Sequence, residues 1–122
     1  LDTARVRQWT GTEYGAAGPA TAPMDGWTSV YSFEYKTMTP SAMRAIARQA
    51  GVHLYTEHET PVYANQRLLA IHLKDGGSQK VFLPKTYGKV IDVLSGATVA
   101  ENAAEFTYTF ATPDTALFEL VK

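Results

Sequence analysis

The chain has 122 residues, of which 45% are hydrophobic and 19% are charged, and its net charge at pH 7 is −1. This length is typical of one domain, and the near-neutral charge predicts neither a nucleic-acid partner nor attraction to an anionic membrane. The absence of cysteine excludes disulfides and thiolate metal ligands. The chain contains no apolar run of about 18 residues, so no membrane-spanning segment is predicted. Because the chain starts Leu-Asp-Thr without a signal-peptide pattern, we expect it to be a piece of a longer protein.

Residues 1–25 are predicted to be an irregular segment or linker, because Gly, Ala, Thr and Pro dominate residues 11–23. Residues 26–122 are predicted to form one domain. This domain opens with a strand over Trp27–Tyr35, in which side chains of one parity place four aromatic rings on one face. That face is either part of the core or an exposed platform on which sugar rings stack. The four aromatic residues are Trp27, Tyr31, Phe33 and Tyr35.

One helix is predicted over Thr39–Ala50. Thr39 is a suitable N-cap, and Pro40 suits the first helical position, where its missing N–H costs nothing. Gly51 supplies the left-handed residue that ends the helix. The spacing i, i+3, i+4, i+7 gives one apolar stripe, made of Met43, Ile46, Ala47 and Ala50.

After Gly51, short apolar runs alternate with turns, which predicts consecutive antiparallel strands. Leu68–Leu73 is apolar at both parities except for His72, as is typical of a central strand covered on both faces. Asp75-Gly76-Gly77 predicts a hairpin turn, and Pro84 is expected to end the next strand. The predicted fold is mainly β, an antiparallel β-sandwich of about seven to nine short strands with one α-helix at about residues 40–50. The predicted strands are Val52–Thr56, Pro61–Asn65, Leu68–Leu73, Gln79–Leu83, Lys89–Leu94, Thr98–Glu101, Glu105–Ala111 and Thr115–Val121.

The three histidines and the carboxylates near them are the candidates for catalysis and metal binding. Glu57 and Glu59 flank His58 in a predicted turn, but a glycosidase needs carboxyl groups roughly 5 to 10 Å apart on opposite sides of a bond, in environments that separate their pKa values. Two residues of one exposed turn offer neither condition, so no catalytic residue is predicted. His53, His58 and His72 show no HxH or HxxxH spacing, so no metal site and no cofactor are expected.

One set of residues remains as a candidate ligand-binding site. If Val52–Thr56 folds back on Pro61–Asn65, Tyr55 lies beside Tyr63. Stacking rings together with amide and carboxylate acceptors are what sugar recognition requires. The alternative is an ordinary cross-strand aromatic pair beside a solvated turn. The candidate set is Trp27, Tyr55, Glu57, His58, Glu59, Tyr63 and Asn65.

Several segments resemble the C-terminal β-sandwich region of large bacterial β-galactosidase-like glycoside hydrolases, over about Val30 to Leu120. In such enzymes a catalytic barrel domain comes first and holds the catalytic carboxylates. The resemblance therefore implies a non-catalytic accessory domain that supports the catalytic domain or an oligomer interface. The segments that carry the resemblance are Ala47–Tyr55, Val62–Asn65, Leu68–His72, Leu83-Pro84, Val90–Gly96 and Thr115–Phe118.

Three functions follow as hypotheses. The first is a structural accessory domain whose partner is the catalytic domain of the parent chain, with a homo-oligomer as a further possibility. The second is a carbohydrate-binding module that holds an oligosaccharide with exposed aromatic rings, and the third is a freestanding small hydrolase. A glycoside hydrolase context favours export to the periplasm or the extracellular space. Exposure of Trp27, Tyr55 and Tyr63 distinguishes the first two hypotheses, because a stacking platform requires exposed rings.

Overall fold

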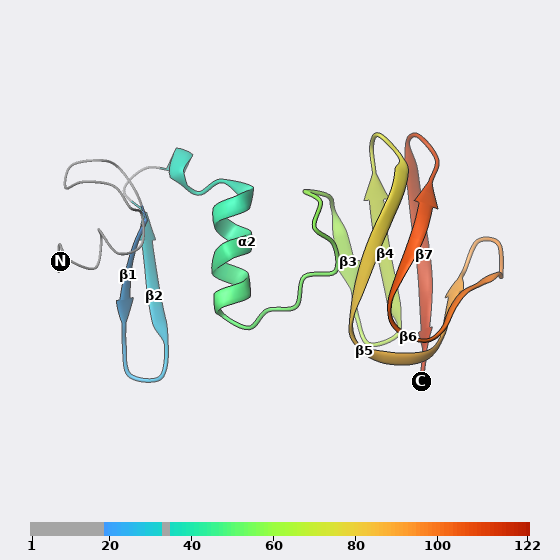
Figure 1. The fold of residues 1–122 in the computed structure, drawn as a ribbon. Helices are drawn as coiled ribbons and strands as arrows, with labels where there is room; N and C mark the ends of the chain where they lie inside the picture. The colour runs from blue at the N-terminus through green and yellow to red at the C-terminus, as the bar shows by residue number, and fades with distance from the viewer. Residues whose placement is uncertain (1–18, 33–34) are drawn as a thin grey trace. The chain divides into compact units, whose positions relative to one another are not determined.

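The computed structural model describes residues 19–32 and 35–122. The chain divides into two compact units, Leu1–Gly51 (unit 1) and Val52–Lys122 (unit 2). Within the described residues, the structure is mainly β, with two antiparallel sheets and one α-helix (Figure 1). The predicted fold class is confirmed. The division after Gly51 differs from the predicted division after residue 25.

Unit 1 contains a hairpin of two strands, β1 (Pro19–Pro23) and β2 (Thr28–Ser32). The hairpin turns at Met24–Trp27, where the Met24 N–H donates to the Trp27 carbonyl at 2.7 Å. Gly26 has a φ of 76° in this turn, a conformation that glycine adopts without steric cost. The expectation of an irregular segment is therefore wrong for Pro19–Pro23.

The predicted strand over Trp27–Tyr35 is shorter than expected. Trp27 lies in the hairpin turn, β2 ends at Ser32, and Tyr35 begins a short 3-10 helix, η1 (Tyr35–Thr37). Phe33, which belonged to the predicted aromatic face, lies outside the described residues. Tyr31 is more than half exposed, so the interpretation of its face as core is wrong at that residue.

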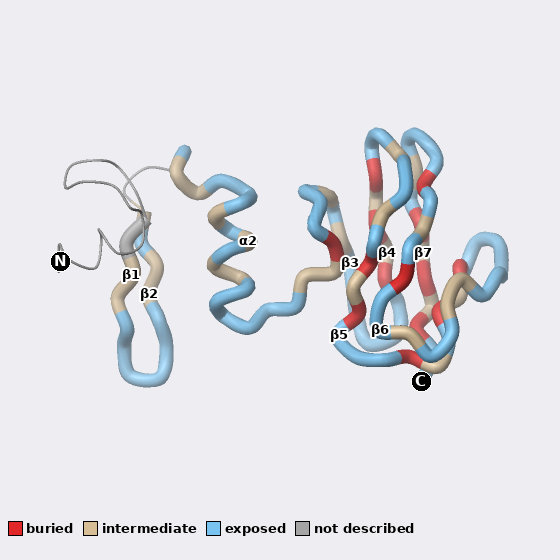
Figure 2. The backbone as a smooth tube through the Cα atoms, viewed as in Figure 1, coloured by how far each residue is buried: buried red, intermediate tan, exposed pale blue. Residues whose placement is uncertain are grey.

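Helix α2 (Pro40–Gln49) confirms the predicted capping. The Thr39 hydroxyl accepts a hydrogen bond from the Ala42 N–H at 3.2 Å, and Gly51 follows the helix with a φ of 74°. None of the ten helical residues is buried, and buried residues among the described parts of the chain all lie in unit 2 (Figure 2). Helix α2 therefore contributes no residue to the buried core.

Unit 2 is a five-stranded antiparallel sheet that folds into a sandwich. Its strand order is β3-β4-β7-β5-β6, so consecutive strands in the sequence are not all neighbours. The strands are β3 (Val62–Ala64), β4 (Leu68–Leu73), β5 (Gly77–Asp92), β6 (Thr98–Phe110) and β7 (Asp114–Val121).

Strands β5 and β6 are long and take part in both layers of the sandwich. The first part of β5 pairs with the last part of β6, from Gly77 opposite Phe110 to Phe82 opposite Glu105. The pairing resumes at Tyr87, and from Lys89 onward β5 also pairs with β7. The sequence prediction of separate strands here is wrong. Pro84, which cannot donate to a ladder, lies where the pairing is interrupted, but the extended strand continues through it.

Two turns connect the layers and contact each other. Asp75–Gly76 joins β4 to β5, which are not paired, so the prediction of a hairpin at this turn is wrong. The Thr112 hydroxyl, in the turn between β6 and β7, donates to the Asp75 carbonyl at 2.9 Å. A Cβ placed on Gly76 would overlap Thr112 Oγ1 and the Ala111 carbonyl oxygen. Glycine at position 76 thus permits the close approach of the two turns.

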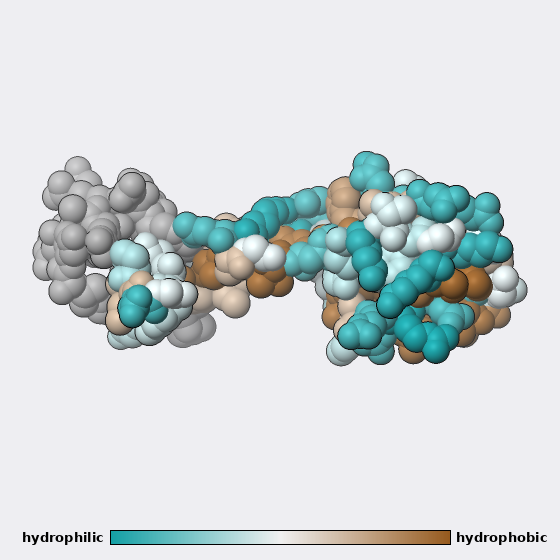
Figure 3. Space-filling model, turned by 90° about the horizontal axis from the view of Figure 1, so that it is seen from below, coloured by the Kyte–Doolittle hydropathy of each residue, from teal (hydrophilic) through white to brown (hydrophobic). Residues whose placement is uncertain are grey.

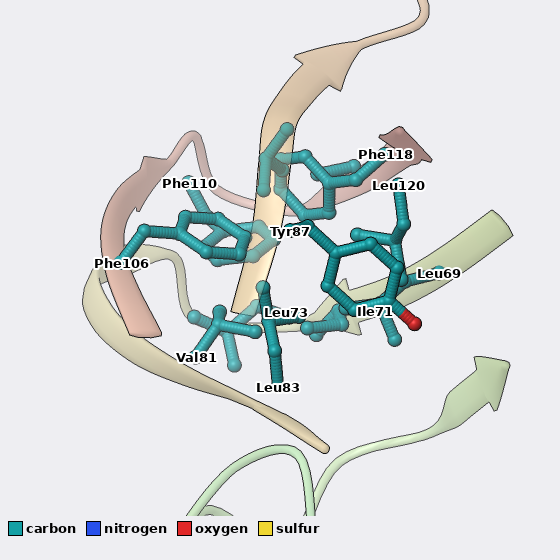
Figure 4. Packing of buried hydrophobic residues seen from close by; sticks show 12 residues of the cluster. Leu69, Ile71, Leu73, Val81, Leu83, Tyr87, Phe106, Phe110, Phe118 and Leu120 are labelled. Atoms are coloured by element: carbon teal, nitrogen blue, oxygen red, sulfur yellow. The ribbon is translucent and has the colours of Figure 1, made fainter. Parts of the chain in front are cut away.

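The core lies between the two layers of unit 2 (Figure 4). Leu69, Ile71 and Leu73 point into it from β4, whereas Leu68 is exposed on the opposite face. The prediction that β4 is covered on both faces is therefore wrong. Phe118 is fully buried at the centre and contacts the Phe106 ring edge-to-face at 5.0 Å. The other buried apolar residues are Val81, Leu83, Tyr87, Val90, Phe110, Ala116 and Leu120.

Candidate functional site

The segment Val52–Thr56 is not a strand and does not pair with β3. Instead it lies along β5, where the Phe82 N–H donates to the Tyr55 carbonyl at 2.8 Å and His53 Nε2 lies 2.9 Å from the Phe82 carbonyl. Strand β3 pairs with β4, which places Tyr63 opposite Ala70. The predicted cross-strand pair of Tyr55 and Tyr63 is therefore wrong.

Tyr55 is a half-buried residue at the margin of the core. Its ring meets the His53 ring edge-to-face at 4.7 Å, and its side chain packs against the buried cluster. Desolvation raises the pKa of the Tyr55 phenol, and the nearby Tyr87 adds to this effect. These contacts indicate that Tyr55 anchors the segment before β3.

The Glu57-His58-Glu59 turn forms one wall of an open hollow of about 680 Å³. The Thr56 hydroxyl accepts a hydrogen bond from the His58 N–H at 3.1 Å, which shapes this turn. The opposite wall comes from the end of β4 and the turn into β5. The residues lining the hollow are Glu57, His58, Glu59, Thr60, Pro61, His72, Leu73, Lys74, Asp75, Gly76 and Gln79.

Part of this lining was not predicted from the sequence, because the contact depends on topology. Lys74, Asp75 and Gln79 reach the hollow because the chain passes there from β4 into the first part of β5, which pairs with β6 and not with β4. His72 is fixed beside the hollow: its Nδ1 lies 2.8 Å from Thr115 Oγ1, and its carbonyl accepts a hydrogen bond from the Thr60 hydroxyl. The local sequence contains no signal for this arrangement.

The hollow collects charge without the geometry of a metal or glycosidase site. Three carboxylates, those of Glu57, Glu59 and Asp75, line it together with Lys74. Among residues 19–32 and 35–122, no group of three or more His, Asp or Glu side chains is placed to hold a metal ion. Glu57 and Glu59 are both exposed and belong to one turn. The hollow can offer polar contacts to a ligand.

Asn65 serves the turn between β3 and β4. Its side-chain oxygen accepts hydrogen bonds from the N–H groups of Arg67 and Leu68, each at 2.8 Å. An asparagine that closes a turn in this way is a common structural device. The oxygen that a sugar hydroxyl would need is thus already engaged.

Two of the predicted ligand-binding aromatic residues are exposed. Trp27 is 60% exposed in the hairpin turn of unit 1, and Tyr63 is 74% exposed on β3, an edge strand of unit 2. Tyr31 on β2 is 55% exposed. The expected condition for stacking, exposed rings, is therefore met at Trp27 and Tyr63 but not at half-buried Tyr55.

An apolar row crosses the outer face of the five-stranded sheet. The pairings place Tyr63 beside Ala70 and Ala70 beside Leu117, and the Val93 N–H donates to the Leu117 carbonyl at 2.8 Å. Leu68 lies next to this row and is 40% exposed. We call Tyr63, Leu68, Ala70, Leu117 and Val93 the outer face. Brown hydrophobic surface is visible on unit 2 beside teal hydrophilic side chains in Figure 3.

Charged pairs border this outer face. Arg67 Nη2 lies 2.5 Å from Glu119 Oε1, and Lys89 Nζ lies 3.9 Å from Glu101 Oε1 across β5 and β6. The exposed Leu94 side chain lies in the turn after β5. An apolar centre with a polar rim is the usual anatomy of a protein–protein interface.

One buried carboxylate was not identified from the sequence. Asp92 accepts hydrogen bonds from the Ser95 hydroxyl at 2.7 Å, the Leu94 N–H at 3.0 Å and the Tyr108 hydroxyl at 3.2 Å. The pKa of Asp92 is lowered, mainly by the hydrogen bond from the Ser95 hydroxyl. Burial acts in the opposite direction and raises the pKa, whereas the hydrogen bonds from Leu94 and Tyr108 lower it further. Burial and the Asp92 bond raise the pKa of Tyr108. This group fixes the hairpin turn between β5 and β6.

Comparison with known proteins gave no match to a protein-family model, to a curated protein or to a solved structure. Among the described residues, no helix has the length and apolar character needed to cross a membrane.

Proposed function

We propose that this chain is a non-catalytic accessory region of a larger glycoside hydrolase. Unit 2 supplies a rigid β-sandwich whose outer face packs on a neighbouring domain of the same protein, the catalytic domain. The glycoside hydrolase context rests on the resemblance of segments between Val30 and Leu120. The docking role rests on the outer face.

The observation that carries the docking role is the exposed apolar row on that face. Tyr63 and Leu68 contribute large exposed side chains, and Val93 extends the row across the sheet. Contiguous exposed apolar surface with a charged rim marks interaction sites, because removing apolar surface from water lowers the free energy of the complex. Aromatic rings such as Tyr63 are enriched at the centres of interfaces.

The test is a binding measurement between the 122-residue chain and the separately produced remainder of the parent protein, by isothermal titration calorimetry. We expect Leu68→Glu to weaken binding at least about tenfold, since it places a charge within the buried contact. Val52→Glu is the matched control, because Val52 is an exposed aliphatic residue outside the outer face. Equal affinities of Leu68→Glu and wild type would contradict the proposal.

A second function, carbohydrate binding, is favoured by the exposure of Trp27 and Tyr63. Each ring presents a flat apolar face of the kind on which a sugar ring stacks. The test is calorimetric titration with galactose-containing oligosaccharides at millimolar concentration. If this function is correct, Trp27→Ala or Tyr63→Ala removes the heat of binding. Absence of heat with the wild-type chain would eliminate this candidate.

A further inference from the structure

The two edges of the five-stranded sheet are protected to different degrees. Strand β3 at one edge has only three residues and follows Pro61, and short strands and proline both blunt an edge. Strand β6 at the other edge has thirteen residues, Thr98–Phe110. Within the described residues its ladder partner is β5 alone. A strand of this length leaves a row of backbone N–H and C=O groups directed away from the sheet.

The composition of β6 does not protect its edge. The strand contains no proline, lysine or arginine, the residues that commonly prevent edge-to-edge pairing. Its charged residues are Glu101 and Glu105, which are directed to lysines of β5: Glu105 Oε1 lies 2.7 Å from Lys80 Nζ. Asn102, with a φ of 48°, is the one left-handed residue of the strand, and it leaves the part from Ala103 to Phe110 uninterrupted.

We propose that this edge pairs with a second copy of the chain, β6 against β6 in antiparallel orientation about Thr107. In this register Thr107 lies opposite Thr107 of the other copy, and Glu105 lies opposite Thr109. Thr107 and Thr109 are both exposed on the outer side of the layer. Phe106 lies opposite Tyr108 on the core side, which continues the aromatic cluster of the sandwich.

The self-complementary pattern of side chains is what selects a second copy as the partner. Pairing about Glu105 would place two carboxylates opposite each other, and like charges at opposed positions destabilise a sheet. Pairing about Thr107 avoids this and provides Thr–Thr and aromatic cross-strand pairs. This inference does not depend on the proposed accessory role, because the edge of β6 and the outer face are different surfaces.

The test uses sedimentation equilibrium of the full 122-residue chain from about 1 μM to about 1 mM, a range that covers weak to moderate dimers. Thr107→Glu is expected to weaken the dimer at least about threefold, because two carboxylates would face each other across the axis. The same carboxylate would face Lys80 within the monomer, so folding is preserved. Thr109→Lys is expected to strengthen the dimer at least about threefold. In the dimer, the lysine of each copy would lie opposite Glu105 of the other copy, which gives two pairs of opposite charge.

Ser78→Lys is the control, since Ser78 lies opposite Thr109 on β5, within the layer and away from the edge. It should leave the dimer constant unchanged, and thermal unfolding should show that all variants fold. A wild-type chain that stays monomeric over the whole range would overturn the proposal. The proposal would also be overturned if Thr107→Glu and Thr109→Lys changed the association constant of the dimer in the same direction, or if neither changed it.

Discussion

At the scale of single residues, Gly76 in the turn before β5 and Gly77 at the start of β5 distinguish the cost of backbone strain from the cost of steric overlap. Both have positive φ, 64° at Gly76 and 98° at Gly77, but a Cβ on Gly77 meets no atom within 4 Å. We expect Gly77→Ala to lower the free energy of unfolding by about 1–2 kcal/mol, the cost of left-handed backbone. Gly76→Ala should cost at least about 1 kcal/mol more, because it also overlaps the Ala111–Thr112 turn. Equal costs in urea unfolding would show that the turns do not contact each other.

Asp92 predicts a dependence of stability on pH. Its pKa in the folded chain lies below its unfolded value, so the ionised carboxylate stabilises the fold above about pH 4. This contribution is lost as the pH falls through the folded pKa. At pH 7, Asp92→Asn should lower the free energy of unfolding by about 1–3 kcal/mol, since the buried donors lose a charged acceptor.

The measurement is denaturant unfolding of wild type and Asp92→Asn between pH 7 and pH 2.5. The difference in the free energy of unfolding between wild type and Asp92→Asn should shrink as the pH falls below about 4. Glu101→Gln is the control, because Glu101 pairs with Lys89 at the exposed surface and such pairs contribute little. A difference that stays constant across this range would contradict the role given to the Asp92 carboxylate.

At the scale of elements, α2 provides a test of capping with little contribution from burial. Thr39→Ala removes the acceptor for the Ala42 N–H, and such a loss typically costs about 1 kcal/mol. Because no residue of α2 is buried, this cost should appear as lower helicity in circular dichroism at 222 nm. Ser41→Ala is the control. It removes the hydrogen bond between the Ser41 and Thr39 hydroxyls but leaves the Thr39 hydroxyl in place as the acceptor for the Ala42 N–H. Equal helicity of Thr39→Ala and Ser41→Ala would contradict the capping role.

The elements that could be predicted are those with local signals. Capping residues defined α2, a run apolar at both parities defined β4, and alternating side chains defined β7, with boundaries nearly correct. The hairpin of β1 and β2 was missed although Asp25-Gly26 is a strong local turn signal. The bend of β5 and β6 could not be predicted, because strand pairing is decided by contacts between segments far apart in the sequence.

The candidate site shows the same limit. Of the set predicted from residue type, Trp27 and Tyr63 are exposed, whereas Tyr55 and Asn65 take structural roles. Val52–Thr56 has the composition of a strand but contacts β5 through a few bonds only. The outer face was missed because it requires the order of strands β3, β4 and β7.

At the scale of the whole molecule, the core of the described residues belongs to unit 2 alone. Where the structure describes burial, the buried apolar residues all lie between Leu69 and Leu120. We therefore expect a fragment of residues 52–122 to unfold cooperatively, with a midpoint temperature within a few degrees of that of the whole chain, since size and buried area set the transition. Calorimetry compares the two. A fragment that is unfolded at room temperature would show that unit 1 is needed for the sandwich.

The measurement that tests the proposed function most directly is hydroxyl-radical footprinting of the outer face. The oxidation rates of Tyr63, Leu68 and Val93 are compared between the 122-residue chain alone and the same residues within the longer protein. We predict several-fold lower oxidation of all three in the longer protein, because an accessory domain buries this face against its neighbour. Val52, exposed but outside the face, should react equally in both. Equal oxidation of Tyr63, Leu68 and Val93 in the two samples would contradict the account.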